Sequence, residues 1–155
     1  DGSNPSPATI FISLLLVNKL REIFEHTADA GIRAESPTLS EAFNEVSLAF
    51  TEIVTGGSLP NKKTNFKIEI KATTLDSLLV NYISHLIYLF DTENFLVSSA
   101  AITVKTESCT ISGTLEGDFY DESKHGYGVE IKAVSYHMLK ISEGPPSEIV
   151  VILDL

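Results

Sequence analysis

The chain has 155 residues, of which 43% are hydrophobic and 21% are charged. This size and composition fit one globular domain with a substantial buried core. Its 11 Lys and Arg residues against 21 Asp and Glu residues give a net charge of −10. Such a field repels a phosphate backbone, so direct nucleic-acid binding is not expected, whereas docking onto a basic protein is permitted.

Cysteine usage and hydropathy indicate where the protein works. Cys109 is the only cysteine, so no internal disulfide can form, and no Cys and His pairs have zinc-finger spacing. We therefore expect a cytoplasmic protein. The apolar run at 8–17 is shorter than the roughly 20 residues that span a bilayer. It also lacks the flanking features of a secretory signal.

The N-terminal part begins with a polar segment and continues with an apolar one. Residues 1–7 are rich in Gly, Ser, Asn and Pro, which is typical of a mobile lead-in. The apolar segment at 10–23 is compatible with a buried strand or with a helix. We favour a helix over 13–24.

Two helices are better defined. Thr38 and Glu41 have capping-box spacing, and apolar residues then recur at three- and four-residue steps until Gly56 and Gly57, which predict the end of that helix. Alternation over 66–72 predicts a half-buried strand. A second helix follows, capped by Thr73 or Thr74, apolar around much of its circumference and ending near 91–94.

The remainder of the chain is rich in strand-like segments. Turn signals at 117–118, 126–128 and 144–146 separate them. The expected strands are 96–105, 109–116, 129–135, 138–142 and 149–153. The sequence therefore predicts an α+β domain in which two main helices pack on a mixed, largely antiparallel sheet.

The densest group of polar side chains lies at 25–29. His26 and Asp29 are three residues apart, so a turn would direct both into one pocket. A carboxylate suits calcium, magnesium or manganese, and a nearby imidazole shifts the preference toward a transition metal. The alternative is structural, with Asp29 capping local amides in an Asx turn and His26 bonded to a backbone carbonyl.

Two further positions are ambiguous in the same way. Asp154 ends an apolar strand and precedes Leu155, whose terminal carboxylate would be a second anionic group at the same place. Adjacent carboxylates attract a cation, although a charged strand end also needs no functional explanation. Lys132 lies in an apolar segment, where it could pair with Glu130 on one strand face or lie near the carboxylates.

Other kinds of site are excluded by spacing. The segment from Asp91 has Leu96 and Ile102 where a calcium-binding EF-hand loop needs glycine and glutamate. The four histidines lack a nucleophile elbow or a His-Glu-x-x-His motif. No catalytic residue is predicted.

Several blocks in the same order resemble the archease family, and the resemblance covers 22–155, leaving 1–21 as an N-terminal extension that is partly flexible. The blocks are His26-Thr27-Ala28-Asp29-Ala30-Gly31-Ile32, Thr38-Leu39-Ser40-Glu41-Ala42-Phe43, Leu86-Ile87-Tyr88-Leu89-Phe90, Tyr120-Asp121 with His125, Glu130-Ile131-Lys132-Ala133-Val134-Ser135-Tyr136-His137, and Asp154-Leu155.

The resemblance implies a protein that activates an RtcB-type tRNA ligase in tRNA splicing and RNA repair and is not itself an enzyme. It implies a metal site formed by Asp29, Asp154 and Leu155, with Lys132 and His26 acting on the partner. The oxygen donors favour calcium, with magnesium or manganese as alternatives. Two other functions stay open, a metal-dependent hydrolase using His26, Asp29 and Asp154, and a chaperone-like binding module.

Overall fold

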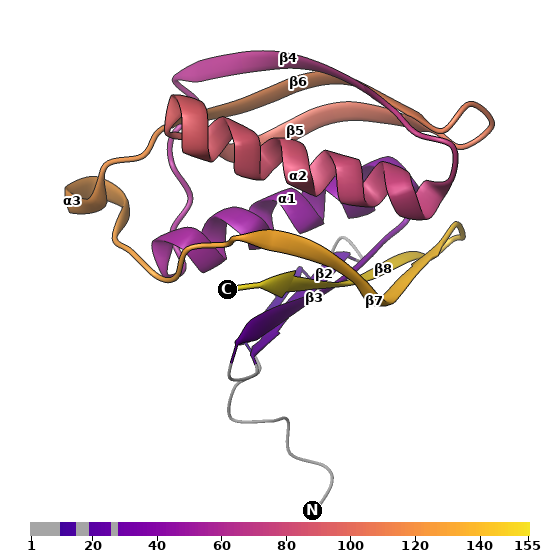
Figure 1. The fold of residues 1–155 in the computed structure, drawn as a ribbon, viewed down its shortest axis with the longest axis horizontal. Coiled ribbons are helices and arrows are strands. Elements are labelled where there is room, and N and C mark those ends of the chain that lie inside the picture. Colours follow the sequence, from indigo (N-terminus) through magenta and orange to yellow (C-terminus); the bar gives the residue numbers. More distant parts are fainter. Residues whose placement is uncertain (1–9, 15–18, 26–27) are drawn as a thin grey trace, which may run out of the picture.

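The arrangement of the chain is given by a computed structural model that describes residues 10–14, 19–25 and 28–155. Two antiparallel sheets enclose the two long helices, so the layers run sheet, helices, sheet (Figure 1). The five-stranded sheet has the order β1 (Ile10–Leu14), β2 (Lys19–Glu25), β3 (Asp29–Ser36), β8 (Ser147–Asp154) and β7 (Ala133–Ser142). The three-stranded sheet has the order β4 (Thr64–Lys71), β6 (Thr110–Phe119) and β5 (Phe95–Lys105).

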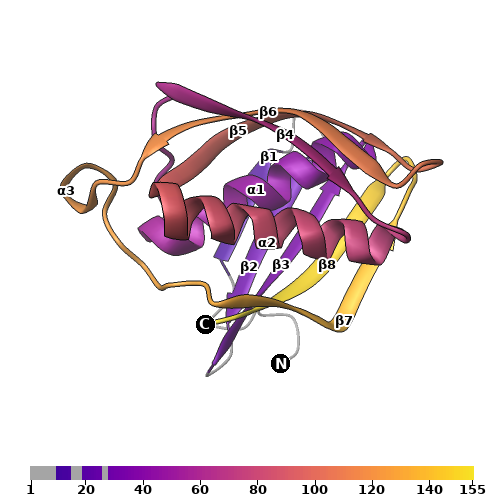
Figure 2. The same cartoon turned by 45° about the horizontal axis from the view of Figure 1, so that its top comes forward.

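The first helix, α1 (Leu39–Thr55), begins and ends as the sequence predicts. The Thr38 hydroxyl accepts from the Glu41 amide at 3.2 Å and donates to its carboxylate at 2.9 Å, so these groups stabilise the first turn. Gly56 ends the helix in the left-handed region, with φ at 84°. Thirteen residues of α1 are buried because the helix packs between the two sheets (Figure 2).

The second helix, α2 (Leu75–Glu93), also follows its prediction. Thr74 and Ser77 form a reciprocal capping box, and Asn94 ends the helix with φ at 58°. Tyr82 is fully buried beneath Phe43 of α1, with the two ring centroids 5.6 Å apart, and shares a hydrogen bond with Ser47. The helices thus contribute the centre of the core.

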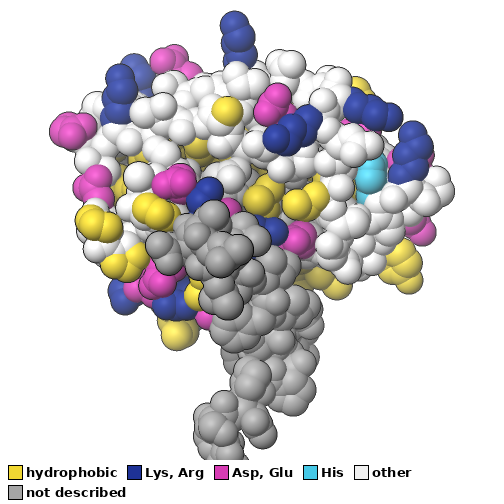
Figure 3. Space-filling view, turned by 180° about the vertical axis from the view of Figure 1, so that it is seen from behind, with side chains coloured by type: hydrophobic (Ala, Val, Ile, Leu, Met, Phe, Trp, Pro, Cys, Tyr) yellow, Lys and Arg dark blue, Asp and Glu magenta, His cyan; other side chains and the backbone are white. Residues whose placement is uncertain are grey.

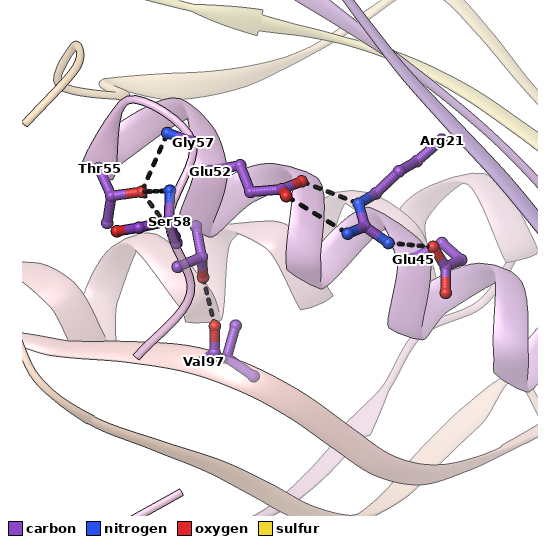
Figure 4. Close-up of polar contacts among 8 residues, drawn as sticks. Arg21, Glu45, Glu52, Thr55, Gly57, Ser58 and Val97 are labelled. Carbon is purple, nitrogen blue, oxygen red and sulfur yellow. Dashed lines mark hydrogen bonds and ion pairs between the residues drawn. The ribbon is translucent and has the colours of Figure 1, made fainter. Parts of the chain in front are cut away.

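One charged cluster is buried between α1 and β2. Arg21 donates to both carboxylate oxygens of Glu52, at 2.8 and 3.3 Å, and also to Glu45, about two turns earlier on the same face of α1 (Figure 4). All three residues are at most 7% exposed. Burial alone would lower the pKa of Arg21, but the bonds and charges of Glu52 and Glu45 outweigh it and raise that pKa. The cluster fixes β2 on the helix.

The predicted helix over 13–24 is wrong. Its described residues, 13–14 and 19–24, belong to β1 and β2, which pair antiparallel, and β2 pairs in turn with β3. Arg21 and Ile23 of β2 are buried while Leu20, Glu22 and Phe24 are only partly so, the alternation of a strand with one face on a core. The apolar pattern of this segment fits either a helix or a strand, and pairing with other strands decides that a strand forms. The boundary between 1–21 and 22–155 stays a prediction.

The α+β class and the two main helices are confirmed, with several differences in detail. The strands form two sheets instead of one, and all described pairings are antiparallel. The turn predicted at 117–118 lies inside β6, and the segments 129–135 and 138–142 contribute to one strand, β7, with an irregular register between Ser135 and Lys140. A four-residue helix, α3 (Glu122–His125), was not predicted. No helix in the described residues is long and apolar enough to cross a membrane.

The five-stranded sheet presents one face to the helices and the other away from them (Figure 1). On β3, Ala30, Ile32 and Ala34 are buried against the helices. The alternate positions, Asp29, Gly31, Arg33 and Glu35, therefore lie on what we call the outer face. Their partners on β8 in the register are Asp154, Ile152, Val150 and Glu148. The candidate site lies on this outer face.

Candidate functional site

Asp29 and Asp154 are direct cross-strand partners at the end of the five-stranded sheet. Asp29 is the first residue of β3 and Asp154 is the last residue of β8, and the antiparallel register places them opposite one another. Directly opposed residues have Cβ atoms about 4.5–5.5 Å apart on one face. Two carboxylates that are distant in the sequence therefore lie side by side and can reach a common point.

The Asp29 carboxylate has an unusual environment. Its Oδ1 atom is buried and has no hydrogen-bond partner among the described residues. The Asx turn considered from the sequence would have bonded this carboxylate to local amides, whereas Asp29 instead begins β3. A buried carboxylate oxygen without a donor costs free energy. This oxygen is therefore in a position to bind a cation.

Backbone hydrogen bonds to the neighbouring segments on both sides hold the end of β8 in place. The Leu155 amide donates to the Ala28 carbonyl at 3.0 Å, and the Lys132 amide donates to the Asp154 carbonyl at 2.8 Å. The Leu155 side chain packs against the core. Asp154 is thus held between β3 and the start of β7, with its side chain exposed.

Lys132 lies beside the carboxylate pair but not inside a strand. Ala133, the next residue, is the first of β7 and pairs with Asp154. Lys132 and Glu130 are both exposed, and no described ion pair joins them. The salt bridge proposed from alternation is therefore absent from the described residues, because the chain becomes a strand only at Ala133.

Of the five predicted site residues, the structure brings four together: Asp29, Lys132, Asp154 and Leu155. The fifth, His26, lies outside the described residues. Within the described part of the chain, no group of three His, Cys, Asp or Glu side chains could hold a metal ion. The predicted ligand set has only two such side chains and takes its third donor from the carboxyl group of Leu155.

The donor chemistry fits a hard divalent cation. Both side chains are carboxylates, which calcium, magnesium and manganese prefer. The buried, unpartnered oxygen of Asp29 gains a counter-charge when a cation binds, and the repulsion between two opposed carboxylates is relieved. The residues present are therefore consistent with a cation of this class.

Sequence reasoning missed two residues next to this pair, Phe24 and Gly31. They are cross-strand partners on β2 and β3, and Gly31 shares the outer face with Asp29. The signal that could have found them is strand parity, because Gly31 is two residues from Asp29. That signal was lost when 13–24 was interpreted as a helix.

Comparison with known proteins agrees with this fold. The sequence model of the archease protein family (MTH1598/TM1083) matches residues 22–155. The protein archease of Pyrococcus furiosus is 35% identical over 126 residues, covering 80% of this chain and 89% of that protein. The protein archease of Pyrobaculum neutrophilum is 37% identical over 123 residues, covering 77% and 83% respectively.

A solved structure is similar as well. The solution structure of protein 1598 from Methanobacterium thermoautotrophicum superposes with a TM-score of 0.69 at 34% sequence identity. The superposition covers 86% of this chain and 96% of that chain. The likeness therefore extends over nearly the whole of that chain.

Proposed function

The chain belongs to the archease family, and on that premise we propose that it is a protein cofactor of an RtcB-type RNA ligase. In this role it promotes guanylylation of the ligase and repeated turnover in tRNA splicing and RNA repair. It is not itself an enzyme. Its place of action is the cytoplasm.

The observation that carries this proposal is the pairing of Asp29 with Asp154 beside Lys132. We assign Asp29, Asp154 and the carboxyl group of Leu155 as ligands of one divalent cation. Calcium is the first choice, and magnesium or manganese would also fit. The cation would supply positive charge that draws the two carboxylates together.

The residues around the pair have separate tasks. The Lys132 ammonium is exposed while its amide is fixed to Asp154, so the side chain can reach a partner from an anchored position. Lys132 and His26 are assigned to activation of the ligase. Three protein donors leave coordination positions open, so a group from the ligase could complete the site.

The surface charge supports a protein partner rather than RNA. The net charge is −10, and acidic side chains alternate with basic ones on the face seen in Figure 3, where the described residues form no broad basic patch. An acidic protein is attracted to a basic ligase surface and repelled by free RNA. We expect no direct binding of nucleic acid.

The test is multiple-turnover RNA ligation by a cognate ligase, with and without this protein. Stimulation should be seen at limiting ligase and should be accompanied by faster guanylylation of the ligase. Asp29→Asn and Lys132→Ala should lose the stimulation. If the wild-type protein gives none at any guanosine triphosphate or metal concentration, the proposal is wrong.

The same preparation tests the two alternatives. A hydrolase using His26, Asp29 and Asp154 would turn over a phosphoester or an amide without the ligase, and Asp154→Asn would abolish that activity. A chaperone-like module would bind many unrelated proteins instead of one ligase. Either result would contradict a dedicated ligase activator.

A further inference from the structure

Phe24 of β2 is an aromatic residue on the outer face of the sheet, on the strand next to the one that carries Asp29. Among the described outer-face positions of β2, β3 and β8, only Phe24 is aromatic. A Cβ atom built on Gly31 would lie 2.1 Å from both Cε2 and Cζ of this ring. The Phe24 ring therefore lies directly on the Gly31 backbone, in space that any other residue would fill.

The next strand shows that this part of the outer face is covered. Ile152 is the partner of Gly31 on β8 and lies on the same face, yet it is only 7% exposed. Neither of the two long helices in the described part of the chain packs on this side of the sheet (Figure 1). Phe24, Gly31 and Ile152 thus form an apolar row across three neighbouring strands.

This row borders the carboxylates. Asp29 and Asp154 form the next row along the same face, two residues from Gly31 and Ile152, or about 7 Å along the strands. Aromatic side chains bridge such diagonal neighbours. Asp29 Oδ1 is buried and has no partner among the described residues, and Phe24 is its apolar diagonal neighbour on β2.

Resting on the cation site proposed above, we infer that Phe24 is a positioning residue for it. The ring, seated on Gly31, forms the apolar wall of the site and keeps water from Asp29 Oδ1 when no cation is bound. Gly31 is required because a side chain there displaces the ring.

The expected change in cation affinity follows from the free energy of the cation-free protein. A carboxylate oxygen that is dehydrated and unbonded raises the free energy of the cation-free protein. Binding a cation removes that cost, so the wall strengthens binding without touching the ion. If water can reach the oxygen, the cation-free state is stabilised and the affinity falls.

The experiment is calorimetric titration of calcium into the full chain. Phe24→Ala should raise the calcium Kd about tenfold, the lower end of the effect of outer-shell substitutions, and Gly31→Ala should do the same by moving the ring. Phe24→Tyr keeps the ring and should retain wild-type affinity. In the Phe24→Ala background, Gly31→Ala should cost nothing more, because the two changes remove the same wall.

Leu20→Ala is the matched control. Leu20 is on the same strand and face as Phe24 and is also partly buried. It pairs with Glu35, which lies near the opposite end of β3 from Asp29. It should lower the melting temperature as an apolar truncation but leave the calcium Kd unchanged. If the wild type binds calcium and Phe24→Ala binds it with the same Kd, Phe24 is not a positioning residue. That result would leave the ligase proposal unaffected. If the wild-type chain binds no calcium, both the proposed role of Phe24 and the proposed calcium site are wrong.

Discussion

Asp29 and Asp154 face one another across β3 and β8, and one Asp29 oxygen is buried without a donor among the described residues. Two like charges in direct cross-strand contact destabilise a sheet. The pair is therefore a local weakness that a bound cation can remove.

The first prediction is an opposite response of one variant with and without calcium. In a chelator, Asp154→Asn should melt at or above the wild-type temperature, because one of two opposed charges is gone. Calcium at 100 times its Kd should stabilise the wild type by about 2.7 kcal/mol and leave the variant unchanged. Differential scanning fluorimetry measures both. A calcium shift retained in Asp154→Asn would rule out Asp154 as a ligand.

The second prediction separates charge from packing at Lys132. Lys132→Ala should leave the melting temperature almost unchanged, because the side chain is exposed and forms no ion pair among the described residues, but should sharply reduce ligase stimulation. Lys62→Ala, at another exposed lysine, is the control and should retain full stimulation. Unfolding of Lys132→Ala would show that the residue is structural.

The third prediction concerns the carboxyl group of Leu155. In a chain whose last residue is Leu155, two added residues convert that carboxylate to a peptide carbonyl. Calcium affinity and ligase stimulation should both fall, while the bond from the Leu155 amide to Ala28 preserves the fold. Circular dichroism checks the fold and calorimetry the affinity. Equal calcium affinity in both chains would remove Leu155 from the ligand set.

The fourth prediction is for the buried cluster of Arg21, Glu45 and Glu52. Arg21→Met leaves two buried carboxylates without a counter-charge and should cost about 3–5 kcal/mol of unfolding free energy in urea titration. Replacing Glu45 and Glu52 with Leu in the same chain should recover most of the loss. By comparison, Lys19→Ala, which breaks a partly exposed contact with Glu41, should cost about 0–1 kcal/mol. If Arg21→Met lowers the unfolding free energy only slightly, the charged cluster is not needed for stability.

The fifth prediction is a pH dependence at Glu148. A hydrogen bond from Lys140 at 2.8 Å and one from Arg33 at 2.9 Å lower the pKa of the Glu148 carboxyl below its ordinary value of 4.5. A lowered pKa means that the carboxylate stabilises the fold above pH 4.5, and that this contribution is lost as the pH falls through the folded-state pKa.

Urea titrations at a series of pH values check this. The stability advantage of wild type over Glu148→Gln should be largest near neutral pH and should shrink in acid. Glu143→Gln changes an exposed carboxylate for which the described residues show no ion pair, so its difference from wild type should stay small. A constant wild-type advantage down to acid pH would contradict the prediction.

The sequence by itself determined the parts of the fold that depend on neighbouring residues. Thr38 with Glu41 and Thr74 with Ser77 satisfy the free amides of a helix start within four positions. Gly56 ends α1 because it accepts the left-handed conformation. The alternation of Phe66 and Ile68 identifies β4 for the same reason, since side-chain direction in a strand is a local property.

The tertiary structure alone decided which strands pair. The apolar segment before residue 25 has no period that separates helix from strand, and only the pairing of β2 with β3 made it a strand. The candidate site depends on the same kind of information. Asp29, Lys132 and Asp154 could each be named from the sequence, but their contact arises from the register of β3 against β8 and of β8 against β7. The proposed role of Phe24 depends on the register of β2 against β3, because the burial of apolar faces decides which residues become cross-strand neighbours.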